Sequence, residues 1–196
     1  GEASLPYCSI FSMRVAIALL AISTLWSSIL WGQQVAPGAL EYAVMHRQSF
    51  VVGRLLRQGA DPNQIGSGGS TPIADAALKA DVDIVQVLLR FGAKVDIVSR
   101  DGTLPIHDAA LGGHPQVIQD ILTHGGKVNA KTRDGGQTPL HIAAENGKFK
   151  AAQMLLGYDA DPTIKDAKGR TPLDTAERAG SAEIVALLRK ALADVK

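Results

Sequence analysis

A repeat with a period of about 33 residues dominates this sequence and limits the folds that it can adopt. Prolines recur almost evenly along the chain, at Pro72, Pro105, Pro139 and Pro172. Apolar pairs keep nearly the same period, and they begin at Leu55, Leu88, Ile121, Leu155 and Leu187. Because two unrelated markers share one period, the sequence predicts a solenoid in which each unit packs against its neighbours. We expect Leu88 and Leu122 to lie on the seams between units.

Each unit reads as two short helices joined by glycine-bearing loops. In the third unit, Asp101-Gly102 predicts a turn, and Pro105 then opens a helix, where its missing N–H costs nothing. Apolar residues follow at helical spacing, and Gly125 is typical of a residue that ends a helix in the left-handed conformation. Two helices of this length cannot bury both faces alone, so stacking must supply the stability.

The most specific motif is Thr138-Pro139-Leu140-His141-Ile142-Ala143-Ala144. It resembles the T-P-L-H-x-A-A signature of the ankyrin-repeat family, and degraded copies begin at Thr71, Leu104 and Thr171. The resemblance runs from about residue 39 to residue 195. It implies an all-α fold, an ankyrin-repeat solenoid of stacked helix-turn-helix units with β-turn or hairpin loops, preceded here by a signal-like hydrophobic helix.

Two residues depart from the family pattern. Leu104 replaces a threonine whose hydroxyl, in this family, bonds within the turn and to the motif histidine. Asp159 stands where a loop glycine is expected, a change that is tolerable because aspartate adopts the left-handed conformation more readily than most residues.

The resemblance assigns a structural role to the residues that open the first helix of each repeat. These are Thr71, Pro72, Pro105, His107, Thr138, Pro139, His141, Thr171 and Pro172. His107 and His141 occupy the same position in adjacent repeats, so a metal pair is the alternative interpretation. We favour the structural role, because the signature already places histidine there and no third ligand is evident.

The chain divides into an N-terminal extension, residues 1–36, and five units. The units are an N-terminal capping repeat (39–63), three repeats (64–96, 97–129 and 130–163) and a C-terminal capping repeat (164–196). Terminal units are expected to be atypical because one of their faces meets water.

The extension carries an uncharged run over residues 15–31, directly after Arg14. A positive residue, an apolar run and a small residue before a polar stretch are typical of a secretory signal peptide. We therefore expect a periplasmic or secreted protein of bacterial type, cleaved near Gln33. The alternative is an uncleaved membrane anchor, although the run is at the short limit for a bilayer-spanning helix.

Sequence patterns for chemistry are weak. The single cysteine, Cys8, excludes an intramolecular disulfide and a thiolate zinc site, and 20 Lys+Arg against 19 Asp+Glu disfavour nucleic-acid binding. No G-x-S-x-G motif occurs, and Gly125-Gly126-Lys127 lacks the rest of a phosphate loop. Asp75 and Asp108 recur one period apart, and we interpret them as solvated inner-helix residues instead of a catalytic dyad. We expect no enzyme activity, metal or cofactor.

The expected function is protein–protein interaction by a monomer through the concave face of the solenoid. The family's variable positions place partner-binding residues at the turn tips and inner-helix ends. They are Leu78, Lys79, Arg100, Asp101, Leu111, Arg133, Asp134, Gln137, Glu145, Asn146, Lys168, Arg170 and Arg178. Leu78 and Leu111 would form the apolar centre of the contact, or else merely cover the neighbouring repeat. A membrane-anchored scaffold and a secreted effector that binds a host protein are the alternative functions.

Overall fold

The structure is a computed structural model that describes residues 36–194. The repeats lie in one compact unit, Pro37–Lys196. The hydrophobic run over residues 15–31, and with it the signal-peptide interpretation, lies outside the described residues. Within residues 36–194, none of the helices has the length and apolar character that a membrane crossing requires.

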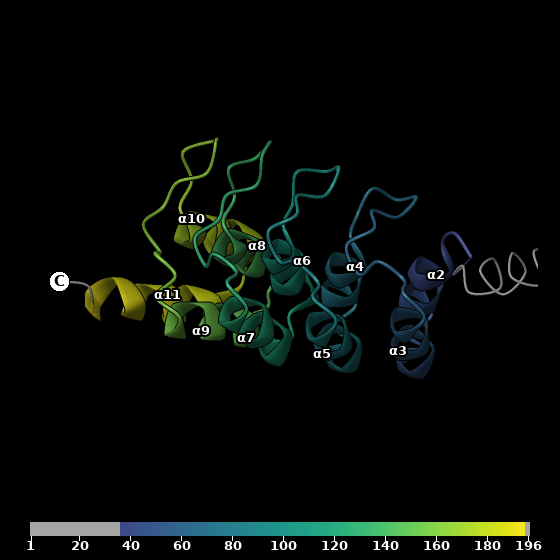
Figure 1. The fold of residues 1–196 in the computed structure, drawn as a ribbon. Coiled ribbons are helices and arrows are strands. Elements are labelled where there is room, and N and C mark those ends of the chain that lie inside the picture. The colour runs from purple at the N-terminus through teal and green to yellow at the C-terminus, as the bar shows by residue number, and fades with distance from the viewer. Residues whose placement is uncertain (1–35, 195–196) are drawn as a thin grey trace, which may run out of the picture. The chain divides into compact units, whose positions relative to one another are not determined.

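Residues 36–194 form helices in five successive pairs and contain no strand, which confirms the predicted all-α repeat fold (Figure 1). The pairs are α2 (Ala39–Met45) with α3 (Ser49–Arg57), α4 (Pro72–Leu78) with α5 (Val82–Arg90), α6 (Pro105–Gly112) with α7 (Pro115–Thr123), α8 (Pro139–Glu145) with α9 (Phe149–Gly157), and α10 (Pro172–Ala179) with α11 (Ala182–Asp194). The even-numbered helices pack on one another as an inner row, and the odd-numbered helices form an outer row.

Small side chains hold the inner row together. The alanine pair of the motif is fully buried in α4, α6 and α8, as Ala76-Ala77, Ala109-Ala110 and Ala143-Ala144. Alanine has no atoms beyond Cβ, so it lets the helix backbones approach closely. The outer row is filled by larger side chains, and Leu88, Ile121 and Leu155 have no exposed surface.

Leu88 and Leu122, both expected on the seams between units, differ in their burial. Leu88 is fully buried as expected, but Leu122 is only partly buried and packs at the edge of the core, while its neighbour Ile121 is fully buried. The apolar pair gives two adjacent candidates, and consecutive residues of a helix point about 100° apart. The helix phase therefore buries the first member of the pair more deeply in this unit.

Four loops, which we call fingers 1 to 4, extend beyond the inner row and comprise residues 64–71, 97–104, 130–138 and 163–171 (Figure 1). One backbone hydrogen bond links each finger to the next. The N–H of Arg100 donates to the Gly69 carbonyl at 2.8 Å, and the N–H of Arg133 donates to the Gly102 carbonyl at 3.1 Å. The N–H of Ala167 donates to Gly135, in the finger that carries the additional glycine, at 3.0 Å.

A second set of contacts joins the loops that follow the outer helices. The side-chain amide of Asn63 accepts from and donates to the backbone of residues 92–94, at 2.7 and 3.2 Å. Asn129 makes the same pair of bonds to residues 159–161, at 2.9 and 3.5 Å. Asp96 occupies the equivalent position between them, and in the described part of the chain it forms no such bond to the next loop. We call these side-chain amide bonds between successive loops the amide ladder, and at Asp96 the ladder lacks one rung.

Candidate functional site

Two buried histidines fix the fingers to one another. Nδ1 of each accepts the backbone N–H of the residue three positions earlier, at 3.0 Å for His107 and 3.2 Å for His141. Nε2 donates to a carbonyl of the next finger, to Ala130 at 3.0 Å and to Arg170 at 2.9 Å. Burial lowers the pKa of both rings. No group of three His, Cys, Asp or Glu within residues 36–194 is placed to hold a metal ion.

Threonine hydroxyls cap three of the inner helices. Oγ1 of Thr71, Thr138 and Thr171 accepts the backbone N–H of the residue three positions later, at 3.4, 3.4 and 3.2 Å. Leu104 opens α6 without a side-chain cap, and its apolar chain instead packs against the core. In place of a hydroxyl, the backbone carbonyl of Leu104 accepts the N–H of His107, at 2.8 Å.

Asp75 and Asp108 are not the solvated residues that the sequence suggested, because both are partly buried where a finger meets its helix. Asp75 accepts from the Ser70 hydroxyl at 2.6 Å, and Asp108 accepts from the Thr103 hydroxyl at 3.4 Å. Burial, with repulsion from Asp101, raises the pKa of Asp108 to about 7. Burial also raises the pKa of Asp75.

Asp166 in finger 4 lies in the opposite electrostatic setting. Its carboxylate accepts from the guanidinium of Arg170 at 2.7 and 2.8 Å, and from the backbone N–H groups of Lys168 and Arg170 at 2.8 and 2.9 Å. Burial acts to raise the pKa of Asp166, but these bonds outweigh it and lower the pKa to about 2. Arg170, which the sequence places among the partner-binding residues, therefore also holds the finger together.

An apolar stripe runs along the exposed side of the inner row. Leu78 at the end of α4 is 45% exposed, and Leu111 near the end of α6 is 37% exposed. Met45, at the equivalent position of α2, is 46% exposed. In α8 and α10 the same position holds Glu145 and Arg178, both exposed. Sequence reasoning missed Met45 because α2 lacks the Thr-Pro motif, although its spacing of one period from Leu78 was a usable signal.

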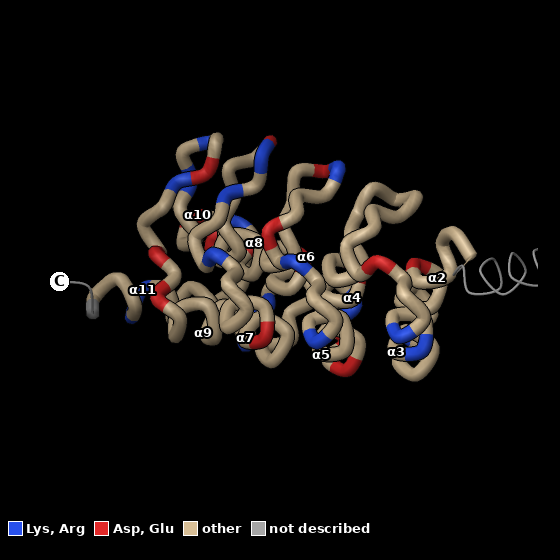
Figure 2. Tube along the Cα trace, in the orientation of Figure 1, with Lys and Arg blue, Asp and Glu red and all other residues tan. Residues whose placement is uncertain are grey.

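The other predicted contact residues lie on the fingers and at the ends of the inner helices. Arg100, Asp101, Arg133, Asp134 and Lys168 are exposed on fingers 2 to 4, and Asn146 is exposed after α8. Figure 2 shows charged residues on fingers 2 to 4 and none on finger 1. Gln137 is half-buried and donates to Glu145 at 2.9 Å. Lys79 is also half-buried, and its carbonyl accepts from Arg47.

Comparison with known proteins agrees with this architecture. A family model for ankyrin repeats (3 copies) matches residues 40–132 and 121–196. Human ARF GTPase-activating protein GIT1 is 49% identical over 49 residues, which are 25% of this chain and 6% of GIT1. An ankyrin repeat protein of Rickettsia bellii is 44% identical over 57 residues, which are 29% of this chain and 34% of that protein. Human Espin-like protein is 42% identical over 55 residues, or 28% of this chain and 6% of its own length.

The matched segments cover 6% of the two human relatives and about a third of the bacterial one. The family match itself extends over nearly all of the described residues, and the capped helix pairs, buried alanines and linked fingers are its physical counterpart. This chain belongs to the ankyrin-repeat family, whose repeats form protein–protein interaction modules.

Proposed function

We propose that this protein is an exported, non-catalytic module that captures a partner protein on the concave face formed by the fingers and the inner row. The observation that carries the proposal is the stripe of Met45, Leu78 and Leu111, exposed at one position of three consecutive units. Isolated exposed apolar side chains are common, but an aligned row of them is typical of an interaction surface.

The surroundings of the stripe suit an interface as well. Recognition surfaces place a dry apolar centre within a polar rim that excludes water. Arg100-Asp101 and Arg133-Asp134 supply both signs of charge at the tips of fingers 2 and 3. The partner would therefore present an apolar ridge flanked by charges of both signs, such as one face of an amphipathic helix.

The cellular part of the proposal rests on residues 15–31. Their uncharged run after Arg14 supports a cleaved signal peptide, and with it a periplasmic or secreted location and a monomeric binding module. Intact-mass analysis of protein recovered from its native compartment is expected to give a chain that begins near Gln33. A species that retains Val15 to Trp31 would instead favour a membrane-anchored scaffold.

Charge placed in the stripe tests the binding face. Partner capture is measured by crosslinking and pull-down from the native cell envelope. The variant Leu78→Asp plus Leu111→Asp is expected to abolish this capture, whereas its thermal melt should change little. Ala186→Asp is the control, because it adds the same charge at an exposed position of α11, in the outer row and outside both grooves described below. Capture that survives in the double variant, or that is lost equally in the control, contradicts the concave-face placement.

A milder substitution covers the case in which two aspartates unfold the stack. Leu78→Ala plus Leu111→Ala removes apolar surface without adding charge, and alanine is a strong helix former. This variant should melt like the wild type and still capture markedly less partner. Unchanged capture would show that neither leucine contributes to binding.

A further inference from the structure

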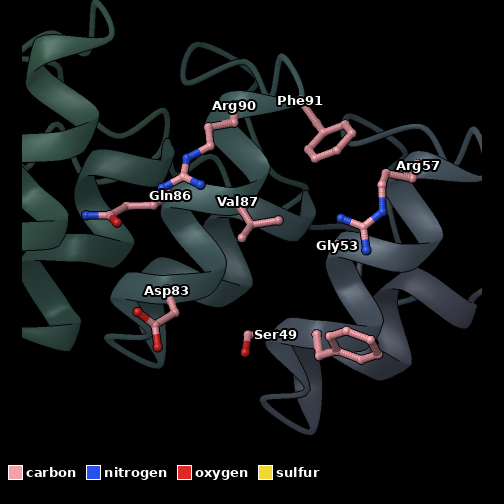
Figure 3. A pocket seen from close by; sticks show the side chains of 9 residues that line it. Ser49, Gly53, Arg57, Asp83, Gln86, Val87, Arg90 and Phe91 are labelled. Atoms are coloured by element: carbon pink, nitrogen blue, oxygen red, sulfur yellow. The ribbon is translucent and has the colours of Figure 1, made fainter.

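A groove lies between α3 and α5 on the outer row, away from the fingers (Figure 3). Its volume is about 390 Å³, and its lining includes Phe50, Gly53, Arg57, Val87, Arg90 and Phe91. None of these residues belongs to the proposed concave face.

The floor of the groove exists because Gly53 has no side chain. Glycine inside a helix costs roughly 0.5–1 kcal/mol relative to alanine, so its presence in α3 calls for a reason. Its φ is not positive, and a Cβ built there would meet nothing closer than Arg57 at 3.7 Å and Val87 at 3.8 Å. Neither the backbone nor crowding requires glycine. In α5 the equivalent position holds Gln86, whose side chain would fill such a space.

Two aromatic side chains stand at the sides of this floor. Phe50 is 76% exposed and Phe91 is 40% exposed, and both line the same groove. By contrast, Phe149 of α9, at the position equivalent to Ser49 and Val82, packs against the core. Exposure of two large apolar rings beside an apolar floor is unfavourable unless something covers them.

The charges of the groove are mainly positive. Arg57 and Arg90 lie on its two helices, and in the view of Figure 3 Phe91 lies between them. Neither arginine forms a salt bridge within residues 36–194, where Asp83 is the acidic residue of the lining. A position at a helix C-terminus already favours a cation, but it does not require two guanidinium groups beside exposed rings.

We propose that this groove binds an acidic peptide segment that carries one large apolar side chain. The apolar side chain would lie on Gly53 and Val87 between the two phenylalanines, and carboxylates on either side would pair with Arg57 and Arg90. Guanidinium groups bind carboxylates with paired hydrogen bonds, and charge complementarity of this kind selects the partner. The site is independent of the proposed concave-face contact.

A second groove on the outer row shows why the charges decide the assignment. It lies between α7 and α9, has a volume of about 370 Å³, and is lined by Pro115, Lys150, Gln153, Met154, Gly157 and Tyr158. It has a similar size, but a single lysine and no phenylalanine. It therefore serves as the reference surface for the test.

The test uses the full chain and a fluorescein-labelled heptapeptide with one phenylalanine between two pairs of glutamates and a glycine at each end. Fluorescence anisotropy should show saturable binding, which weakens at least about tenfold when lysine replaces the glutamates or alanine replaces the phenylalanine. Gly53→Gln, which fills the floor, and Arg57→Glu plus Arg90→Glu, which reverses the charge, should each weaken binding by about tenfold or more.

Two control variants separate this site from the other surfaces. Lys150→Glu on the second groove and the concave-face variant Leu78→Asp plus Leu111→Asp should bind the peptide like the wild type. The proposal is overturned if the lysine peptide binds equally well, or if both groove variants retain the wild-type affinity. It is also overturned if the groove variants instead abolish self-association in sedimentation, or if the chain binds phosphatidylserine vesicles but not the peptide.

Discussion

Fingers 2 and 4 share one backbone plan but treat their carboxylates in opposite ways. At the base of finger 2, Asp108 is partly buried beside the Thr103 hydroxyl, forms no salt bridge within residues 36–194, and its pKa rises to about 7. In finger 4, Asp166 is held by Arg170 and by backbone N–H groups, and its pKa falls to about 2. The surroundings of Asp108 disfavour its ionised carboxylate in the folded state, whereas the surroundings of Asp166 favour its ionised carboxylate.

The same division extends along the exposed side of the stack. The first three units present Met45, Leu78 and Leu111, whereas the last two present Glu145 and Arg178 at that position. The buried interior does not follow this division, because Leu88 and Leu155 are both fully buried. A repeat thus keeps its core constant while adjacent surfaces take on different chemistry.

The largest effect should come from the shared interior. Leu88→Ala and Leu155→Ala each remove a fully buried side chain, so each should lower the free energy of unfolding by about 2–5 kcal/mol. Denaturant melts give the measurement, with exposed Lys168→Ala as a control that should stay within about 0.5 kcal/mol. If only one of the two substitutions lowers the free energy of unfolding strongly, the first three units and the last two differ in their cores as well as on their surfaces.

An intermediate effect, of opposite sign in the two fingers, should come from the carboxylates. Asp166→Asn should lower the free energy of unfolding at pH 7 by about 2 kcal/mol, because it leaves Arg170 without its ionised partner. Asp108→Asn should raise that free energy at pH 8 by about 1–2 kcal/mol, because it removes a carboxylate that the folded state ionises reluctantly.

The pH dependence gives the sharper form of this test. A lowered pKa stabilises the fold above about pH 4, and that stability is lost as the pH falls toward about 2 in the case of Asp166. A raised pKa stabilises the fold below about pH 4, and that stability is lost as the pH rises toward about 7 in the case of Asp108. When the free energy of unfolding is measured across pH, Asp166→Asn should reduce its pH dependence only between about pH 2 and 4. Asp108→Asn should reduce it only between about pH 4 and 7. Loss of both windows in one variant would mean that the two fingers titrate together.

The smallest effect concerns the missing cap. Leu104→Thr should restore the hydroxyl acceptor that Thr71, Thr138 and Thr171 provide, a gain of about 0.5–1 kcal/mol. Part of this gain is offset because Leu104 packs against the core. Chemical denaturation should therefore show a small net increase in stability, whereas a clear loss would assign Leu104 to packing alone.

The helices and their order were predictable because proline, glycine and threonine act locally. Pro72, Pro105, Pro139 and Pro172 each begin a helix, and Asp159 adopts the left-handed conformation, with φ of 59°, that the sequence comparison of the units suggested. These residues restrict their own backbone, so one sequence suffices to place them.

The chemistry of the surface was harder to predict because it depends on neighbours in space. The environment of Asp108 depends on how finger 2 folds back on α6, and no local pattern reports that burial. The groove beside Gly53 arises from a side chain that is missing between the outer helices of two successive units. Met45 was overlooked for a simpler reason, since the motif that sets the register in other units is absent from α2.

The gap in the amide ladder at Asp96 changes which bonds join two neighbouring repeats. Adjacent units contact only their neighbours, so each hydrogen bond between two units opposes their separation. Asn63 and Asn129 supply such links, whereas the junction between repeats 64–96 and 97–129 has none from this ladder. The junctions of a stack bear a pull in series and carry the same force, so this junction must resist it with the backbone bond from Arg100 to Gly69 and the side-chain bond from Gln86 to Asp120.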